Sequence, residues 1–572
     1  MPRGGVQSPM QMTTTIMILI GLAFWLPGIF GISKALEKRY FTPDPERKTP
    51  GVALRDDFDY YPANPYSLFG DHWAATAGGA PLKGGIFISQ WGWLGGILYV
   101  LPVNIFLGSV HDYACGFVTQ RQRGDTPSLI CSKMISKRAG LLFVFLGWLA
   151  IVSFNSAFTL AIGVTAAKFT PEMALPMFVL CVMGPPFGYL LYRKGWPLYV
   201  IAIIEYALMS VMVYLGTLYP IKLPFEFWLF FLAVVGIIAA CVPNWIYTEP
   251  TNFMMFLFMA SGVVILFVGG LISNVPLKAP MLIFYDPQLT PNGWFYPGIA
   301  MVVSCGALTG MHAFWIGAYT TKRFPEERWV RIIGYGGEIL ESVGLWTAFL
   351  SMLVLTPEEV AHAITKIFVV VAYGEGFAKI VSPAFPFLSF EGWKIFAIWV
   401  FVVFMMSTFF SGYRNLRVMG LEFAQGITGK RIVKHPVLAR WISAIVAALT
   451  VTAFAATKAY KWLWPMFPIL STAIAVFTWS MVIMWCKIHG KGAGYWWAAF
   501  WVTLLLIATP AGVYYTYMNA IKGGVYMVFA AVGFLAVIFT WWFSAEFWYK
   551  LKKGFKPEEI DYFRKREYYQ AE

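Results

Sequence analysis

Charged residues are scarce in this chain of 572 residues, because only 13% are Asp, Glu, Lys or Arg whereas 59% are hydrophobic. Soluble domains contain about one quarter charged residues and cannot hide so much apolar surface from water. The composition therefore excludes an ordinary soluble enzyme or binding domain. Apolar runs long enough to cross a bilayer recur from end to end, so we expect an all-α, polytopic membrane protein.

Cysteine and histidine are also scarce. No pair of cysteines has CxxC spacing, which excludes a disulfide framework and the metal sites built on that spacing. No apolar run holds two histidines at the spacing of a b-type haem protein, and CxxCH is absent. We therefore expect no metal and no other cofactor, and we interpret the cysteines as packing residues. They are Cys115, Cys131, Cys181, Cys241, Cys305 and Cys486.

The formal net charge is +14. No basic stripe interleaved with aromatic residues lies in a soluble segment, so nucleic-acid binding is not predicted. Lys and Arg instead gather in alternate loops, which places the C-terminus in the cytoplasm by the positive-inside rule. These residues are Arg121, Arg123, Lys133, Lys137 and Arg138; Arg193 and Lys194; Lys322, Arg323, Arg328 and Arg331; Arg414, Arg417, Lys430, Arg431 and Lys434; Lys487 and Lys491; and Lys550, Lys552, Lys553, Lys556, Arg564, Lys565 and Arg566.

The apolar runs divide the chain, as one polytopic domain over 1–572, into about 15 spans. The first run lacks the signature of a signal peptide and is expected to be retained. With an odd number of spans, 34–67 is a cytoplasmic loop and 548–572 a basic cytoplasmic tail. A less hydrophobic stretch at about 360–390 is expected to be re-entrant or to lie on the surface. The expected spans are 14–32, 68–90, 93–119, 140–166, 174–192, 196–219, 224–243, 252–272, 294–320, 332–355, 392–412, 438–457, 463–486, 494–517 and 523–547.

Two of these spans contain residues that interrupt a helix. One holds Gly78 and Gly79, followed by a proline, and the other holds Gly306 and Gly310 among hydroxyl side chains. Interrupted spans in separate halves of a transporter indicate a substrate site near the bilayer midplane. Their exposed N–H and C=O groups can hold an anion beside a cation. The alternative is that these glycines only allow close helix packing.

Five ordered sequence blocks are spread over about 60–480. They are Tyr61–Gly84; Gly108-Ser109-Val110-His111-Asp112-Tyr113 with Arg121, Arg123 and Gly124; Cys305–His312 with Thr320, Lys322, Gly334-Tyr335-Gly336 and Glu341; Ser407-Thr408 with Arg414, Arg417 and Glu422; and Trp464-Pro465-Met466-Phe467. In this order they resemble the signature of the carbon starvation (CstA) transporters.

The resemblance implies an inner-membrane importer of small nutrients, with pyruvate or short peptides as the usual substrates and protons as the coupling ion. It also implies kinship with the leucine transporter-like fold, a five-plus-five inverted repeat, here with extra helices. A small soluble accessory protein accompanies some members of that family.

The chain departs from the family mainly at polar positions, which concerns the substrate and the coupling ion more than the fold. Asp71-His72 stands for a pair of histidines, Phe410 for an acid, Ser471-Thr472 for Asn-Gln, Lys83 for an apolar residue and Thr251-Asn252 for Arg-Asp.

Acid and imidazole groups near the interruptions are candidates for proton transfer. Asp71 and His72 begin the first interrupted span and could exchange a proton near neutral pH, or Asp71 could simply cap the helix. His312 lies deeper, beside the second interruption. His111 and Asp112 lie near a span end, where they could equally pair two helices.

Other polar groups within the spans are further candidates. A carboxylate at bilayer depth costs about 2.5–3.5 kcal/mol, so Glu205 and Glu341 should face protein or water. Glu341 falls on a family position and is the better candidate for a proton relay. Ser407, Thr408 and Ser411 could supply oxygens to a sodium ion, although such hydroxyls more often hold helices together.

Lys83 follows the first interruption by a few residues. Either its long side chain reaches the membrane interface, or its ammonium group points into a cavity between the interrupted spans. In the cavity it would replace a coupling cation or pair with a substrate carboxylate.

We therefore expect a secondary active transporter, not an enzyme. It would import a pyruvate-like monocarboxylate, an amino acid or a short peptide across the inner membrane by alternating access, coupled to protons rather than sodium ions. Its expected partners are the bilayer and this small molecule. The alternatives are an ion-translocating or structural subunit of a larger complex and, with less support, a channel or a haem-bearing oxidoreductase.

Overall fold

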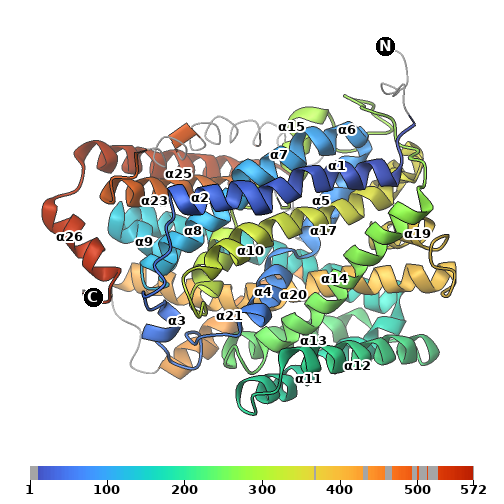
Figure 1. Cartoon of the computed structure of the whole chain (residues 1–572), viewed down its shortest axis with the longest axis horizontal. Helices are drawn as coiled ribbons and strands as arrows, with labels where there is room; N and C mark the ends of the chain where they lie inside the picture. The colour runs from blue at the N-terminus through green and yellow to red at the C-terminus, as the bar shows by residue number, and fades with distance from the viewer. Residues whose placement is uncertain are drawn as a thin grey trace.

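The computed structural model describes residues 11–303, 305–365, 369–429, 436–457, 467–492, 499, 500, 512 and 526–570. Regular structure in these ranges is helical throughout (Figure 1). The helices of the first half are α1 Thr14–Pro27, η1 Gly28–Ile32, α2 Ser33–Arg39, α3 Pro50–Ala53, α4 Pro65–Thr76, α5 Gly79–Ile88, η2 Ser89–Trp91, α6 Trp93–Gly95, η3 Gly96–Val100, α7 Leu101–Val103, η4 Asn104–Gly108, α8 Ser109–Arg121, α9 Pro127–Met134, α10 Lys137–Val164, η5 Thr165–Phe169, η6 Pro171–Met173, α11 Ala174–Tyr192, α12 Leu198–Leu218, α13 Phe225–Cys241 and α14 Thr248–Ser273.

The helices of the second half are α15 Phe295–Val302, α16 His312–Phe314, η7 Trp315–Thr320, η8 Arg331–Tyr335, α17 Gly336–Leu353, α18 Pro357–Thr365, α19 Val369–Val381, α20 Phe390–Thr428, α21 Pro436–Ala456, α23 Phe467–Ile488, α25 Tyr526–Lys553 and α26 Pro557–Arg566.

Ten continuous helical segments of the described chain are long and apolar enough to cross a membrane, so the molecule is a polytopic integral membrane protein. They are Thr14–Arg39, Trp93–Arg121, Lys137–Phe169, Pro171–Tyr192, Leu198–Leu218, Thr248–Ser273, Phe390–Thr428, Pro436–Ala456, Phe467–Ile488 and Ala531–Lys553.

This number differs from the 15 spans predicted from the sequence, chiefly because several apolar runs do not form one long helix. The runs at 68–90 and 294–320 are each interrupted, and α13 has only 17 residues. The run at 332–355 continues into α18 through a bend of 117°. The expected span at 494–517 lies outside the described residues.

The less hydrophobic stretch expected at 360–390 forms α18 and α19. After the bend, α19 packs against α17 and α20. This part of the chain is therefore a helical pair folded back onto the bundle, rather than a further straight span.

α20 is the central element of the bundle. Its 39 residues extend over about 58 Å, well beyond the ~30 Å of hydrocarbon in a bilayer. Of its most apolar stretch 89% is buried, whereas the corresponding figure for α12 is 17%. α20 packs against α4, α10, α13, α14, α19 and α21. Polar side chains within this stretch of α20 therefore face protein, while α12 lies at the periphery.

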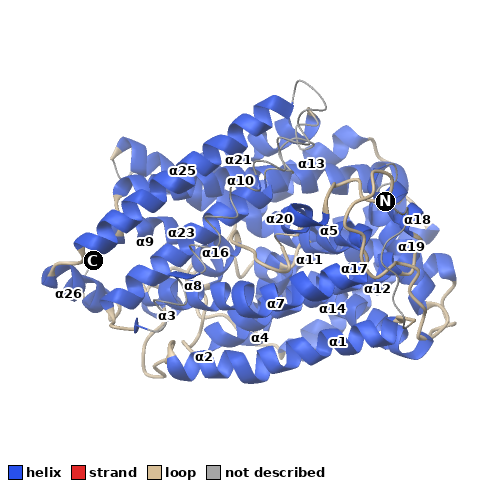
Figure 2. Cartoon of the chain, turned by 90° about the horizontal axis from the view of Figure 1, so that it is seen from above, coloured by secondary structure: helices blue, strands red, loops and turns tan. Residues whose placement is uncertain are grey.

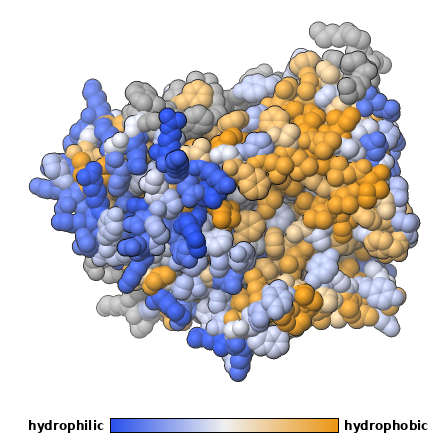
Figure 3. Space-filling model, viewed as in Figure 1, coloured by the Kyte–Doolittle hydropathy of each residue, from blue (hydrophilic) through white to orange (hydrophobic). Residues whose placement is uncertain are grey.

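Basic residues gather at one end of the bundle. We call the loops around Arg121, Arg193, Lys322 and Arg417, with the tail around Arg566, the basic end. This end is hydrophilic in Figure 3, where it lies on the left, while hydrophobic residues cover much of the remaining surface in that view. α26 lies at this end in both Figure 1 and Figure 2.

Candidate functional site

The first interruption separates α4 from α5. α4 begins with Asn64, whose side chain accepts hydrogen bonds from the backbone of Tyr66 and Ser67 at 3.0 and 3.3 Å. α5 has no such cap, because its N-cap residue is Gly78. A β-carbon at Gly78 would overlap the Thr408 hydroxyl of α20. Glycine here lets α20 approach the uncapped, electropositive start of α5.

The second interruption is longer and lies between α15 and α16. Gly306 has a φ of +84°, which disfavours other residues, and its N–H donates to the Thr309 hydroxyl at 3.3 Å. A β-carbon at Gly310 would overlap the Ser471 carbonyl oxygen of α23. The glycines thus keep this segment non-helical and hold it against α23.

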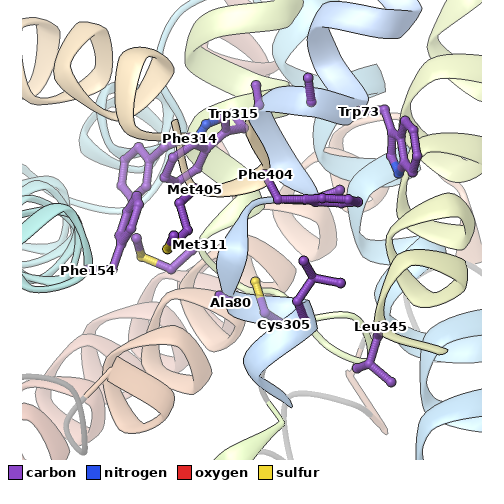
Figure 4. Packing of buried hydrophobic residues seen from close by; sticks show 14 of the residues in the cluster. Trp73, Ala80, Phe154, Cys305, Met311, Phe314, Trp315, Leu345, Phe404 and Met405 are labelled. Atoms are coloured by element: carbon purple, nitrogen blue, oxygen red, sulfur yellow. The ribbon is translucent and has the colours of Figure 1, made fainter. Parts of the chain in front are cut away.

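The two interruptions lie against each other. The first one falls at 77–78, so Pro81 lies within α5. A β-carbon on Gly306 would lie 3.3 Å from the β-carbon of Pro81. Figure 4 shows Cys305 beside Ala80 at this junction.

A small cavity of about 20 Å³ lies between the interruptions. Because one water molecule needs ~10–15 Å³, the cavity has room for little more than one. Its wall is mostly apolar, with four aromatic residues other than His312 and three threonines: Thr76, Gly78, Ala80, Phe154, Phe158, Cys305, Thr309, Met311, His312, Trp315, Thr408 and Phe467.

A buried cluster of one imidazole and three carboxylates adjoins the cavity. Nδ1 of His312 lies 2.8 Å from Oδ2 of Asp112 and 2.8 Å from Oε2 of Glu338. Its Nε2 lies 3.2 Å from Oε2 of Glu341. The four residues are at most 2% exposed. Three elements, α8, α16 and α17, converge on this imidazole.

Two further imidazoles, those of His111 and His72, lie near this cluster. Nδ1 of His111 lies 3.0 Å from the other oxygen of Asp112, and the ring packs edge-on against Trp479. Nδ1 of His72 lies 2.8 Å from the hydroxyl of Thr320. Asp112 therefore contacts both His111 and His312. It connects α8 to α16 and also belongs to the candidate site.

The cluster also has the residue types of a metal centre. The donor atoms of Cys305, His312 and Glu341, and those of Asp112, His312 and Glu338, lie within 4.8 Å of one another. However, two ligands about 2.1 Å from a tetrahedral zinc ion would be ~3.4 Å apart. Nδ1 lies 2.8 Å from both Asp112 and Glu338, which is shorter than this spacing, and its contact with Asp112 is a direct hydrogen bond. These distances favour protons over a metal ion.

A second buried network lies nearer the basic end. The Arg323 guanidinium lies 2.6 Å from Asp71 and 3.4 Å from Glu249, and all three side chains are fully buried. Asp71 also accepts hydrogen bonds from Tyr319 at 2.8 Å and Asn252 at 2.7 Å. The alternative that Asp71 caps a helix is therefore wrong: it lies inside α4, and Asn64 is the cap.

Glu249 connects further residues to this network. It accepts hydrogen bonds from the hydroxyls of Tyr61 and Tyr192, and from that of Ser67 at 2.8 Å. The network thus connects α4, α11, α14 and the segment after η7.

The α20 hydroxyls adjoin the first interruption. Ser407 donates to the Ala74 carbonyl oxygen at 2.6 Å, and Ser411 accepts from the Trp315 indole at 2.8 Å. Both contacts connect helices. Thr408 Oγ1 has no hydrogen-bond partner among the described residues and faces the cavity.

Two candidates from the sequence lie away from the cavity. The Lys83 ammonium lies 4.9 Å from the centre of the Phe87 ring, one turn farther from the interruption. Glu205 is buried in α12, a peripheral helix that packs on α11 and α14.

Residues 13–370 match the sequence model of a family described as carbon starvation protein CstA. The chain is 27% identical over 329 residues to the pyruvate/proton symporter BtsT of Escherichia coli K12, an alignment that covers 55% of this chain and 45% of BtsT. It is 27% identical over 379 residues to the peptide transporter CstA of the same organism, covering 63% of this chain and 52% of that protein. The chain spans about half the length of these curated relatives. Among solved structures, a manganese transporter of Eremococcus coleocola overlaps 86% of this chain and 99% of its own, with 12% identity and a TM-score of 0.45.

Proposed function

Since this chain belongs to the carbon starvation protein CstA family, we propose that it is a secondary active transporter and not an enzyme. Its cargo would be a small organic nutrient: a pyruvate-like monocarboxylate, an amino acid or a short peptide. The names of the relatives support this class of substrate. The inner membrane would be its location, and the basic end, with the C-terminal tail, would face the cytoplasm.

The observation that carries this proposal is the meeting of two interrupted helices at a small buried cavity. The uncapped start of α5 offers free N–H groups for a carboxylate, beside the Thr408 hydroxyl. A cavity of about 20 Å³ holds neither pyruvate nor a peptide, so substrate binding requires the surrounding elements to move apart. Such a closed site suits one stage of alternating access.

The directions of the two segments support an inverted repeat of the five-plus-five kind. Ser67, near the start of α4, shares Glu249 with Arg323 at the basic end. Trp91, beyond the end of α5, donates to the Gly293 carbonyl oxygen just before α15. The segment α4–α5 therefore starts at the basic end, whereas the segment from α15 to η7 finishes there. Related segments of an inverted repeat run in opposite directions in this way.

Protons are the coupling ion that the buried cluster suits best. With His312 protonated and all three carboxylates ionised, it would carry two net negative charges that His111 could only partly offset. An uncompensated charge costs several kcal/mol to bury. We propose that bound protons supply this compensation and that their gain and loss accompany transport. The acid that the family carries beside Ser407 and Thr408 is Phe410 here, which weakens the case for sodium.

Uptake into proteoliposomes tests the proposal. The purified chain should accumulate at least one labelled compound from a panel of monocarboxylates, amino acids and dipeptides, saturably and driven by an inward proton gradient. A protonophore should abolish accumulation, while removal of sodium should not. Non-saturable flux would favour a channel, and no uptake of any compound would count against a transporter. A small soluble accessory protein, which we propose as a partner, can be added as a separate arm.

Lys83→Met should retain most uptake activity. Because the amine lies over Phe87 and away from the cavity, we place Lys83 among residues that reach toward the opposite interface. Initial uptake rates of the Met variant and of Lys83→Arg, compared with the unaltered chain, check this. Loss of uptake in the Met variant but not in the Arg variant would contradict this and indicate that the ammonium group acts in the transport site.

Elemental analysis of the purified protein should find no stoichiometric zinc, iron or manganese. Nδ1 of His312 is hydrogen-bonded to Asp112 and lies 2.8 Å from Glu338, so these atoms are closer together than two ligands of one shared metal ion. One metal ion per chain that is lost in Glu338→Gln would contradict the assignment of this cluster to protons.

A further inference from the structure

A second cavity, lined by polar side chains, lies nearer the basic end than the cavity between the two interruptions, which we call the transport cavity. Its volume is about 10 Å³. Three cationic side chains and one carboxylate line it, from three different parts of the chain. The lining residues are Asp59, Asn244, Ala318, Tyr319, Lys322, Arg414, Asn415, Arg417 and Val418.

The carboxylate is that of Asp59, from the loop between α3 and α4. It accepts hydrogen bonds from Arg414 at 2.7 Å and from Arg417 at 2.7 and 2.8 Å. The two arginine side chains are 2% exposed and that of Asp59 is 18% exposed. Burial alone would raise the pKa of Asp59, but Arg417 and Arg414 hold it well below its usual range.

This cavity contains hydrogen-bonding groups that Asp59 does not use. Both polar atoms of the Asn415 amide and Nε of Arg417 are buried without a hydrogen-bond partner among the described residues. Lys322 is only 7% exposed. Burial lowers the pKa of Lys322, while the carboxylate of Asp59 raises it. Arg414 also donates to the backbone carbonyl oxygens of Ala239 and Val242. Three cations facing one carboxylate, with the unused donors of Asn415 and Arg417 between them, make a site for an anion.

Other acids of this region have their own partners. Asp56 accepts three backbone N–H bonds within its turn, and Asp57 pairs with Arg55 on the surface. Asp125 pairs with Lys133 and Arg566. Asp59 is therefore the carboxylate that enters the cavity.

One face of α20 connects this cavity to the transport site. Thr408 lines the transport cavity and Asn415 lines the second one, seven residues or about 10 Å farther along the helix. Between them, Ser411 accepts the Trp315 indole N–H. The two cavities therefore lie along one stretch of α20, with this contact between them.

We propose that Arg414, Arg417, Lys322 and Asn415 form a carboxylate-binding station between the transport site and the basic end, which the chain's own Asp59 occupies when the transporter is closed and the substrate's carboxylate occupies when it is open. The inference rests on the proposed transport function and names the group of the substrate that the station would bind, the carboxylate that all the proposed cargo classes share. Phe58 anchors the loop beside it, because the Arg440 guanidinium stacks on its ring at 3.9 Å.

Chemical rescue of Asp59→Ala tests the station. The truncation leaves the arginines buried and unpaired, so the purified full-length variant should melt at a lower temperature. Acetate or pyruvate should restore the melting temperature, with a half-maximal concentration at least tenfold below any effect on the unaltered chain. Asp57→Ala is the matched control on the same turn, because the Asp57 side chain is 45% exposed and its ion-pair partner in the described part of the chain is the exposed Arg55. It should gain no response to acetate.

Two further arms keep the test decisive. Arg417→Gln combined with Asp59→Ala should fold with fewer unpaired charges and lose the acetate response. Chloride at equal ionic strength should rescue Asp59→Ala less than acetate does. Absence of acetate rescue, or equal rescue by chloride, would overturn the carboxylate station. Acetate rescue in a protein that transports nothing in proteoliposomes would instead leave a carboxylate-binding site in place, but it would refute the proposed transport function and with it the site's role in substrate passage.

Discussion

His312→Gln is expected to abolish proton-driven uptake while the protein still folds. Glutamine has nearly the volume of histidine and can still donate a hydrogen bond to Asp112, but it cannot accept and release a proton near neutral pH. Without the imidazole, the three carboxylates should remain protonated to avoid buried charge, so the cluster would no longer change its proton content. Accumulation driven by a pH gradient should fall to the level of empty liposomes.

The informative comparison is between driven uptake and exchange. Exchange of labelled for unlabelled substrate across the membrane needs no net proton movement, so His312→Gln should retain it if the residue acts in coupling. His362→Gln is the control, because His362 is exposed on α18. Gradient-driven uptake by His312→Gln at the rate of the control would refute a role for the cluster in proton coupling. Loss of both activities with normal folding would make His312 a substrate-site residue instead.

The sequence predicts the interruptions of the two helices well, because local chemistry determines them. Gly78 and Gly79 are weak helix formers, and Gly306 takes up a φ of +84° that few other residues tolerate. The same local reasoning could have excluded Asp71 as a cap, since Asn64 followed by Pro65 is a stronger helix start. The number of spans was less predictable, because an apolar run does not reveal whether it forms one helix or two short ones.

The partners of the buried charges could not be predicted in this way. Glu338 lies one helical turn before Glu341, a spacing that places both on one face of α17, but nothing in the sequence places that face against His312. Arg323 has the sequence context of any topology-determining arginine in a basic loop. Only the tertiary fold buries it between Asp71 and Glu249, from α4 and α14. Charged pairs between distant segments leave no periodic signal in a single sequence.

Arg323→Met should destabilise the protein more than any other single substitution proposed for the basic end. It leaves the carboxylates of Asp71 and Glu249 fully buried without their cation, and breaking a buried pair in this way costs about 3–5 kcal/mol. Arg328→Met is the matched control, because Arg328 is 65% exposed and pairs with an exposed Glu326, an interaction of about 0–1 kcal/mol. Melting of the two purified variants in detergent measures the difference.

The same network allows a test of why Arg323 matters. Neutralising its partners, with Asp71→Asn and Glu249→Gln added to Arg323→Met, removes the uncompensated charges and should recover much of the lost stability.

If the network also keeps the basic end closed, the recovered triple variant should favour an open basic end, because the ion pairs of Arg323 then no longer connect α4 and α14 to the segment after η7. A cysteine placed at Ala318, in the wall of the second cavity, would then react faster with a water-soluble thiol reagent than the same cysteine in the unaltered background. Equal melting of Arg323→Met and Arg328→Met would show that this buried ion pair contributes no net stability.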